Sequence, residues 1–295
     1  MQSLMQRGAG WGLVMAVTAA LWAAPAHPAQ TPAPAELRVK FEQLEAAHSP
    51  DTLKAGLHII SVERPDMLQG DVYALLDHPY AKVSAELTRP EAWCDIMLLH
   101  VNIKACAVIP GGDGTRLSVN IGMKEEQTLD NTQRAVFDYR NATVRADLAV
   151  IRLQADEGPM GTRDYRIALA ITPVGTRATL MHMRYTYAYG FAGKLAMKTY
   201  LATAGANKVG FTTESDASGT PSYVRGVRGA VERNTMRYFL AVEAYLAALQ
   251  TPADARLEQR LNLWFDGTER YSRQLRELNR DVYLKAKRSE YRRTP

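Results

Sequence analysis

The residues best suited to metal binding or nucleophilic catalysis are few and widely spaced. The chain has six histidines and two cysteines. The histidines form no HExxH pair, no GxSxG nucleophile elbow is present, and Cys94 and Cys106 do not form a CxxC pair. We therefore assign no catalytic residue, and we expect neither a metal site nor a cofactor.

The first 26 residues have the three parts of a secretory signal peptide. Arg7 precedes an apolar run over 11–24 that is too short to cross a bilayer as a helix, and Ala24-Pro25-Ala26 supplies the small residues of a cleavage site. No cysteine lies beside this site, so a lipid anchor is not expected. We predict that 1–26 are removed, that 27–35 form a proline-rich linker, and that the protein is periplasmic or secreted.

Export bears on the two cysteines, because oxidising compartments form and keep disulfides. A bridge between Cys94 and Cys106 would close a short loop, which the chain-entropy model values at about 3 kcal/mol of stability. Two independent buried thiols are the alternative, since free cysteine is often buried.

The charge distribution does not indicate a nucleic-acid-binding body. The chain carries a net charge of +5, and residues 253–295 contain 11 basic and 7 acidic side chains, so the rest is close to neutral. Either this basic tail makes transient contact with an anionic membrane surface, or it is a solvated helix end. Its last basic residues are Lys285, Lys287, Arg288, Arg292 and Arg293.

Alternating apolar residues and turn residues predict an antiparallel sheet that two short helices interrupt. A helix over 35–46 precedes two strands within 57–78, which Arg64-Pro65-Asp66 separates. Short helices over 79–87 and 90–98 follow. A glycine-linked hairpin and three further strands then extend to residue 174.

The last predicted strand, over 179–189, has one face of methionine and tyrosine. Its alternation places Met181, Met183, Tyr185 and Tyr187 on the inner face. His182 and Arg184 then lie on the outer face. Methionine adapts its shape and tyrosine combines an apolar ring with a hydroxyl group, so the inner face suits an apolar ligand, with a filled core as the alternative.

Helices are predicted over 192–204 and, as the longest element, over 222–249. Gly226 and Gly229 make the first half of the long helix thin, which indicates close packing or an adjacent space.

An apolar stripe with four-three spacing continues over 254–286 after Thr251-Pro252, with a bend expected at Gly267. This stripe predicts a helical extension that folds back on the body. The alternative is a partner helix from another chain, because the same spacing forms coiled-coil seams.

The order of these elements, and the stretch GDVYALLDHPYAKVSAELTRPEAWCDIMLLHVNIKAC in particular, resembles the START-like, or SRPBCC, helix-grip superfamily. This superfamily includes lipid-transfer domains, polyketide cyclases and the birch pollen allergen, and the resemblance extends to bacterial START-like proteins. It spans residues 57–249 and implies an α+β fold in which a curved antiparallel sheet wraps around the long C-terminal helix. Residues 36–250 would form this domain and 251–295 a C-terminal helical extension.

The resemblance also implies a cavity between the sheet and the long helix that holds a lipid or another hydrophobic small molecule. The residues expected to line it are Tyr139, Ile167, Leu169, Met181, Met183, Tyr185, Tyr187, Val227, Ala230 and Val231.

We therefore expect an exported carrier or sensor of a hydrophobic ligand. One alternative is a cyclase-like or hydrolase-like enzyme on the same scaffold. The other is an interaction protein that has a filled core and acts through its C-terminal helices. A cavity would separate the first two from the third, and convergent ionisable groups inside it would favour the enzyme.

Overall fold

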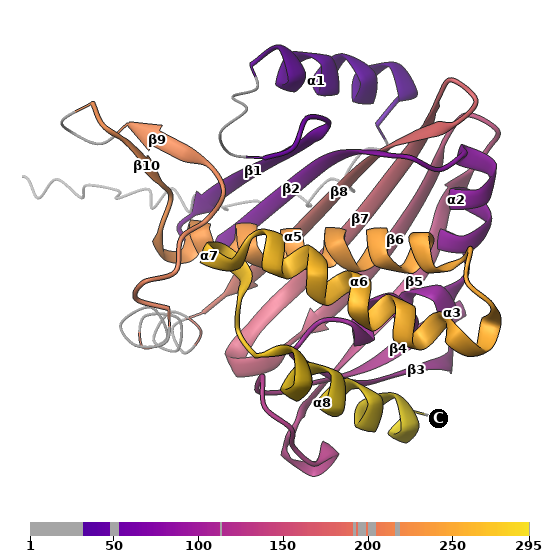
Figure 1. Cartoon of the computed structure of the whole chain (residues 1–295), viewed down its shortest axis with the longest axis vertical. Coiled ribbons are helices and arrows are strands. Elements are labelled where there is room, and N and C mark those ends of the chain that lie inside the picture. The colour runs from indigo at the N-terminus through magenta and orange to yellow at the C-terminus, as the bar shows by residue number, and fades with distance from the viewer. Residues whose placement is uncertain are drawn as a thin grey trace, which may run out of the picture. The chain divides into compact units, whose positions relative to one another are not determined.

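An eight-stranded antiparallel sheet forms the scaffold of the molecule (Figure 1). Its strands are β1 Leu57–Arg64, β2 Met67–Leu76, β3 Ile103–Gly111, β4 Gly114–Ile121, β5 Gln133–Val144, β6 Ala149–Glu157, β7 Thr162–Val174 and β8 Ala178–Tyr189. The helices α2 Tyr80–Leu87 and α3 Pro90–Leu98 carry the chain from β2 to the far edge, and β8 returns to pair with β2. The order across the sheet is therefore β1-β2-β8-β7-β6-β5-β4-β3.

This computed structural model describes residues 32–47, 53–112, 114–190, 193, 199, 205–215 and 219–294. The predicted signal peptide, most of the predicted linker and nearly all of the helix predicted over 192–204 lie outside the described residues. Short 3₁₀ helices, η1 Leu129–Asn131, η2 Pro159–Gly161 and η3 Ala253–Ala255, lie in connecting segments.

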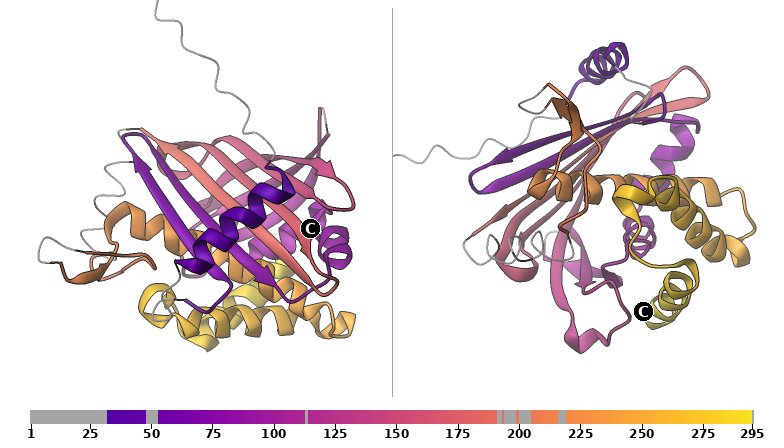
Figure 2. Two further views of the ribbon diagram at one scale, coloured as in Figure 1. Left: turned by 90° about the horizontal axis from the view of Figure 1, so that it is seen from above. Right: turned by 60° about the vertical axis from the view of Figure 1, so that its left-hand side comes forward.

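The long helix α5, Gly226–Ala248, packs on the inner face of the sheet, which curves around it (Figures 1 and 2). Alternation along β8 turns Met183, Tyr185 and Tyr187 toward α5, where they share one core with Val231 and Phe239. This arrangement confirms the predicted α+β helix-grip fold.

A second, smaller core lies on the outer face of the sheet, under α1, Pro34–Ala46 (Figure 2). Proline in the first turn and the backbone N–H of Ala33, which donates to the Glu36 carboxylate, favour a helix start here. Leu37 of this helix packs against Tyr73 and Leu180. His182 is a neighbour of Leu180 on this face, so the predicted register of β8 is confirmed.

The inner face contacts α5 closely at Gly70 of β2. A Cβ atom built on Gly70 would lie 2.2 Å from Oγ1 of Thr235 and 3.4 Å from a methyl carbon of Val231. Thr235 is fully buried, and its hydroxyl group donates to the backbone oxygen of Val231. Because any side chain at position 70 would push the helix away, this glycine sets the distance between α5 and the β1–β2 half of the sheet.

The hairpin of β9 Thr213–Ser215 and β10 Pro221–Tyr223 corrects the expected start of the long helix. Position 222 belongs to β10, and α5 begins at Gly226, which has a φ of 63° that favours glycine. The backbone N–H of Gly210 donates to the oxygen of Val224, which pins the segment before the helix to the chain upstream.

Gly229 serves close packing, which decides between the two alternatives expected for this glycine, and no adjacent space is left at it. A Cβ atom at Gly229 would lie 3.0 Å from the oxygen of Val224 and 3.1 Å from the nitrogen of Gly210. Nearby, the buried Glu232 carboxylate accepts from the backbone N–H groups of Phe211 and Thr212.

The C-terminal extension forms three helices that fold back on the body: α6 Arg256–Arg270, α7 Ser272–Leu275 and α8 Arg280–Arg293 (Figure 1). Leu261, Trp264 and Tyr283 are buried in the main core, so the four-three stripe has an intramolecular partner. The helix predicted through Gly267 is interrupted at Tyr271, four residues further on. Gly267 lies inside α6 and lets Leu240 of α5 approach, at 3.1 Å from a Cβ built there.

A fully buried ion cluster attaches α8 to β3, the edge strand. The ammonium group of Lys104 donates to one oxygen of the Glu290 carboxylate at 2.9 Å, and that of Lys287 donates to the other at 2.7 Å. Lys287 also donates to the backbone oxygens of His100 and Ile103. Burial lowers the pKa of Lys287 to about 8, although Glu290 acts in the opposite direction.

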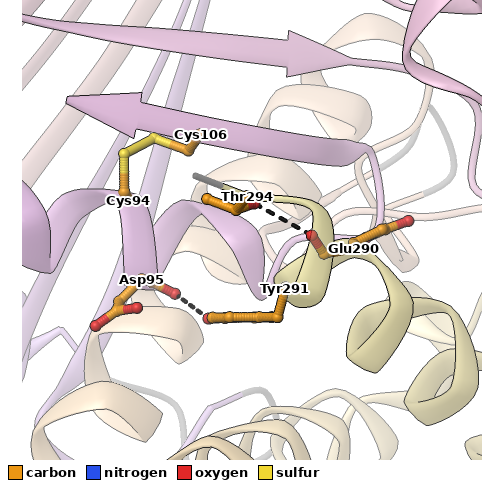
Figure 3. The surroundings of a disulfide bond; sticks show 6 residues. All are labelled: Cys94, Asp95, Cys106, Glu290, Tyr291 and Thr294. Carbon is orange, nitrogen blue, oxygen red and sulfur yellow. Dashed lines mark hydrogen bonds between the residues drawn. A yellow bond between two sulfur atoms is a disulfide. The ribbon is translucent and has the colours of Figure 1, made fainter. Parts of the chain in front are cut away.

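The predicted disulfide between Cys94 and Cys106 is present and joins α3 to β3, with its Cα atoms 5.2 Å apart (Figure 3). The end of α8 lies beside it, where the Tyr291 hydroxyl group donates to the backbone oxygen of Asp95 at 2.7 Å. The bridge, the ion cluster and this hydrogen bond therefore hold α3, β3 and α8 together.

We expect Gly70→Ala to lower the free energy of unfolding by about 1–3 kcal/mol, because the added methyl group overpacks the contact with Thr235. Gly112→Ala is the matched control, since a Cβ at Gly112 has nothing within 4 Å, and it should change stability by less than about 0.5 kcal/mol. Denaturant-induced unfolding of both variants measures the difference. Equal stabilities would show that α5 adjusts to the methyl group at no cost.

We expect Glu290→Gln to lower the free energy of unfolding by about 3–5 kcal/mol, because it leaves two buried ammonium groups without a counter-charge. Glu258→Gln removes the half-exposed carboxylate that pairs with Arg288 and should cost about 1 kcal/mol or less. Urea unfolding curves of the two variants give the comparison, and a similar loss for both would contradict the special role of the buried cluster.

Candidate functional site

A cavity of about 140 Å³ lies between the inner face of the sheet and α5. Its walls come from most elements of the inner face. The apolar lining residues are Met97, Ile103, Val119, Ile121, Phe137, Pro159 and Ile167. The residues with polar groups are His100, Asn102, Tyr165, Tyr185, Asn234 and Tyr238.

Strand alternation and one helical turn bring these side chains together. Val119 and Ile121 are two residues apart on β4 and therefore face the same side of the sheet. Asn234 and Tyr238 are four residues apart on α5, so they lie one above the other on the helix face toward the cavity. His100 comes from the short turn between α3 and β3.

Three tyrosines, Tyr165, Tyr185 and Tyr238, line the cavity, and Tyr187 packs behind them in the core. The ring centroids of Tyr165 and Tyr187 lie 5.4 Å apart, those of Tyr165 and Tyr185 6.1 Å, and those of Tyr185 and Tyr238 5.8 Å. Burial raises the pKa of each of these four phenols. The cluster therefore offers apolar ring faces and neutral hydroxyl groups.

His100 lies beside the tyrosine cluster and is held neutral. Burial lowers its pKa well below the usual value, and the positive charges of Arg237 and Lys287 act in the same direction. Its ring stacks on Tyr238, with centroids 5.0 Å apart and planes 22° from parallel.

Comparison with known proteins yields similarity to solved structures. No family model matches the chain, and no curated protein does. A START superfamily protein from Mycobacterium smegmatis is 14% identical over 47% of this chain and 92% of its own, with a TM-score of 0.32. Human StAR-related lipid transfer protein 5 is 9% identical over 56% of this chain and 86% of its own, with a TM-score of 0.32. Norcoclaurine synthase from Thalictrum flavum is 13% identical over 50% of this chain and 89% of its own, with a TM-score of 0.33.

The strand order and the helix enclosed by the sheet, together with α2 and α3 between β2 and β3, decide the fold. The chain has a helix-grip fold. Within Pro32–Pro295 the chain is one compact unit, so the C-terminal helices are built onto the helix-grip body.

Two of the residues expected to contact a ligand, Ile167 and Tyr185, line this cavity. Six others are buried in the surrounding core: Tyr139, Leu169, Met181, Met183, Tyr187 and Val231. Val227 and Ala230 are partly exposed near the start of α5. Ligand contact by any of these ten residues stays a prediction.

Sequence reasoning missed several lining residues, above all His100 and Asn234. The spacing of Asn234 and Tyr238 on the long helix could have indicated a shared face toward the sheet. His100 lies in a turn, where neither strand alternation nor helical spacing gives its direction, so its place could not be read from the pattern.

The polar cluster on the outer face belongs to the support of the sheet. The Asp71 carboxylate accepts hydrogen bonds from His182 at 2.7 Å and Arg184 at 2.8 Å, and His182 stacks on Tyr73. Burial acts to raise the pKa of Asp71, but the His182 hydrogen bond and the Arg184 charge outweigh it, so the pKa is lowered. This Asp–His pair lies on the opposite side of the sheet from the cavity.

Some basic side chains of the C-terminal tail are buried or paired within the protein, and others are exposed to solvent. Lys287 is 1% exposed within the ion cluster, so its expected place in an exposed basic tail is wrong. Arg288 pairs with both oxygens of Glu258, and Arg293 donates to the backbone oxygen of Gln127, whereas Lys285 and Arg292 are exposed.

Within the described ranges, no group of three or more His, Cys, Asp or Glu side chains is arranged to hold a metal ion. No helix among the described residues is long and apolar enough to span a bilayer.

We expect the four clustered phenols to resist ionisation at pH 10, where the tyrosines of an unfolded chain titrate. A folded pKa above the unfolded value gives stability that is complete below pH 10 and is lost as the pH rises above it. Tyrosinate absorbance and circular dichroism, followed together against pH, should show these phenols ionising only as the protein unfolds. Complete titration of all 14 tyrosines near pH 10 with an intact fold would contradict the burial of the cluster.

Proposed function

We propose that the protein binds a hydrophobic small molecule in the cavity between the sheet and α5, and that it acts as an exported carrier or sensor of that molecule. The observation that carries the proposal is the cavity itself, which has mostly apolar walls and a few polar groups, the usual composition of small-molecule sites. The resemblance to START-like domains implies the same kind of ligand.

The cavity volume sets the size of the ligand. A cavity of about 150 Å³ in another protein holds one benzene molecule, so about 140 Å³ accommodates a single ring or a short chain. A long lipid chain would require α5 to move away from the sheet, against the close contact at Gly70.

The lining chemistry favours binding over catalysis. No Asp, Glu, Lys or Arg is among the described residues that line the cavity, and its ionisable groups are one neutral histidine and three tyrosines with raised pKa values. General acid–base catalysis works best with a pKa near the working pH, which these groups lack.

The apparent signal peptide supports export, because a carrier is useful where an apolar molecule must cross an aqueous compartment. Contact with an anionic membrane would fall to exposed residues of the basic tail such as Lys285 and Arg292. A partner helix along 254–286 has less support, since Leu261, Trp264 and Tyr283 of this segment are already buried against the body.

We expect toluene to bind the purified protein, and Ile167→Phe to abolish binding with little loss of stability, because the larger ring fills existing space. Leu169→Phe is the matched control two residues along the same strand, in the filled core. It should cost about 1–3 kcal/mol of stability and leave toluene binding by the folded protein intact. Ligand-detected NMR and denaturant unfolding measure both properties.

Organic extraction of protein purified from its own source, followed by mass spectrometry, should in addition yield a stoichiometric small apolar molecule. If toluene does not bind and Ile167→Phe is as destabilising as Leu169→Phe, the space is part of a filled core and the ligand-binding proposal is wrong.

A further inference from the structure

His100 presents a hydrogen-bond donor to the cavity. The backbone N–H of Asn102 donates to Nδ1 of His100 at 3.2 Å, so Nδ1 acts as an acceptor and carries no proton. The neutral ring then carries its proton on Nε2. Because the side chain lines the cavity and the residue is only 4% exposed, this N–H group is withdrawn from bulk water.

Among the described residues no acceptor meets this donor with hydrogen-bond geometry, although the Asn234 side chain lies near enough to oppose the lowering of the His100 pKa. Nε2 of His100 is buried and lacks a hydrogen-bond partner among the described residues. A buried polar group without a partner costs free energy, and such groups are rare in folded proteins unless they have a role. The unpaired donor therefore needs an explanation.

The ring is held in this orientation from several sides. It stacks on Tyr238, and its own backbone oxygen accepts hydrogen bonds from the ammonium group of Lys287 at 2.6 Å and the N–H of Ile103 at 3.0 Å. Turning the ring to find another acceptor would break the Asn102 hydrogen bond and the stack. The donor is thus fixed in advance of any ligand.

Other polar groups of the lining have partners within the protein. The Asn102 amide donates to the backbone oxygen of Gly122 at 2.7 Å, and the side-chain oxygen of Asn234 accepts from Arg237 at 3.4 Å. The Tyr165 hydroxyl group forms a hydrogen bond with Oγ1 of Thr162 at 2.8 Å. Among the described residues that line the cavity, His100 is the one with a fully buried side-chain nitrogen or oxygen atom that has no hydrogen-bond partner.

We propose that the ligand carries a carbonyl-type oxygen that accepts a hydrogen bond from Nε2–H of His100, while its apolar part lies against the tyrosine cluster. This inference rests on the proposed function and narrows it from hydrophobic molecules in general to small ketones, aldehydes or esters of about one ring. Arg237, Lys287 and Lys104 act on the ring as positive charges, and a carbonyl oxygen, the negative end of its dipole, suits this field better than a donor group does.

The test compares two probes of similar shape, cyclohexanone and methylenecyclohexane. The first has a carbonyl oxygen where the second has a CH₂ group. We expect cyclohexanone to bind the purified protein about tenfold more tightly, the usual value of one net hydrogen bond. In His100→Phe the preference should disappear while methylenecyclohexane still binds, because the phenyl ring keeps the stack and removes the donor. Tyr238→Phe, which keeps a ring beside His100 and removes a hydroxyl group from the same wall, should retain the preference.

The outcomes separate the two proposals. If neither probe binds, the proposed function fails. If both bind with equal affinity, or if the preference persists in His100→Phe or is lost in Tyr238→Phe, hydrophobic binding stands and the role of His100 is overturned. Should His100→Phe fail to fold, ¹⁵N NMR of wild-type protein replaces it: the Nε2 resonance of His100 should shift with cyclohexanone and not with methylenecyclohexane, and an unchanged resonance would overturn the inference.

Discussion

The contact of Gly70 with Thr235 and Val231 sets the distance between the sheet and α5 at one side of the interior. It brings the backbone of β2 close to α5 at the β1–β2 side of the sheet. Side chains must fill the space between α5 and the remaining strands, where the curved sheet and the helix are further apart. The cavity lies there, bordered by Ile121 and Phe137 on one side and by Tyr185 on the other. Close packing at one end of the interior and open space at the other thus follow from a single short contact.

The open side of this arrangement requires separate support, because a cavity removes packing that would otherwise hold its walls. The wall formed by β3 is the sheet edge, and an unpaired edge strand is a weak element. In this chain α8 covers it, the Glu290 carboxylate pairs with two buried ammonium groups there, and the Cys94–Cys106 bridge joins it to α3. Lys287 also fixes the turn that carries His100, so the same cluster supports both the edge and the donor in the cavity.

Much of the fold could be predicted from local pattern, because strand alternation and helix periodicity are local properties. The alternation of β8 correctly separated Tyr185 from His182, and the two helices after β2 were placed within a residue of their observed bounds. The site was harder to predict, because a cavity depends on how closely two elements that are distant in the sequence pack against each other. Gly229 could have meant close packing or an adjacent space, and only the position of the Gly210 backbone decides for close packing. Lys287 looked like a solvated tail residue, because nothing near it in the sequence shows that Lys104 and Glu290 share its burial site.

The buried cluster also constrains the order in which the chain can complete its structure. Lys104 of the edge strand is neutralised by a carboxylate 186 residues further along the chain. During synthesis, β3 leaves the ribosome long before α8 exists, and its ammonium group cannot be withdrawn from water without a counter-charge. The β3 edge must therefore stay hydrated until the last helix has been made, so that the wall of the cavity closes only after translation has passed Glu290.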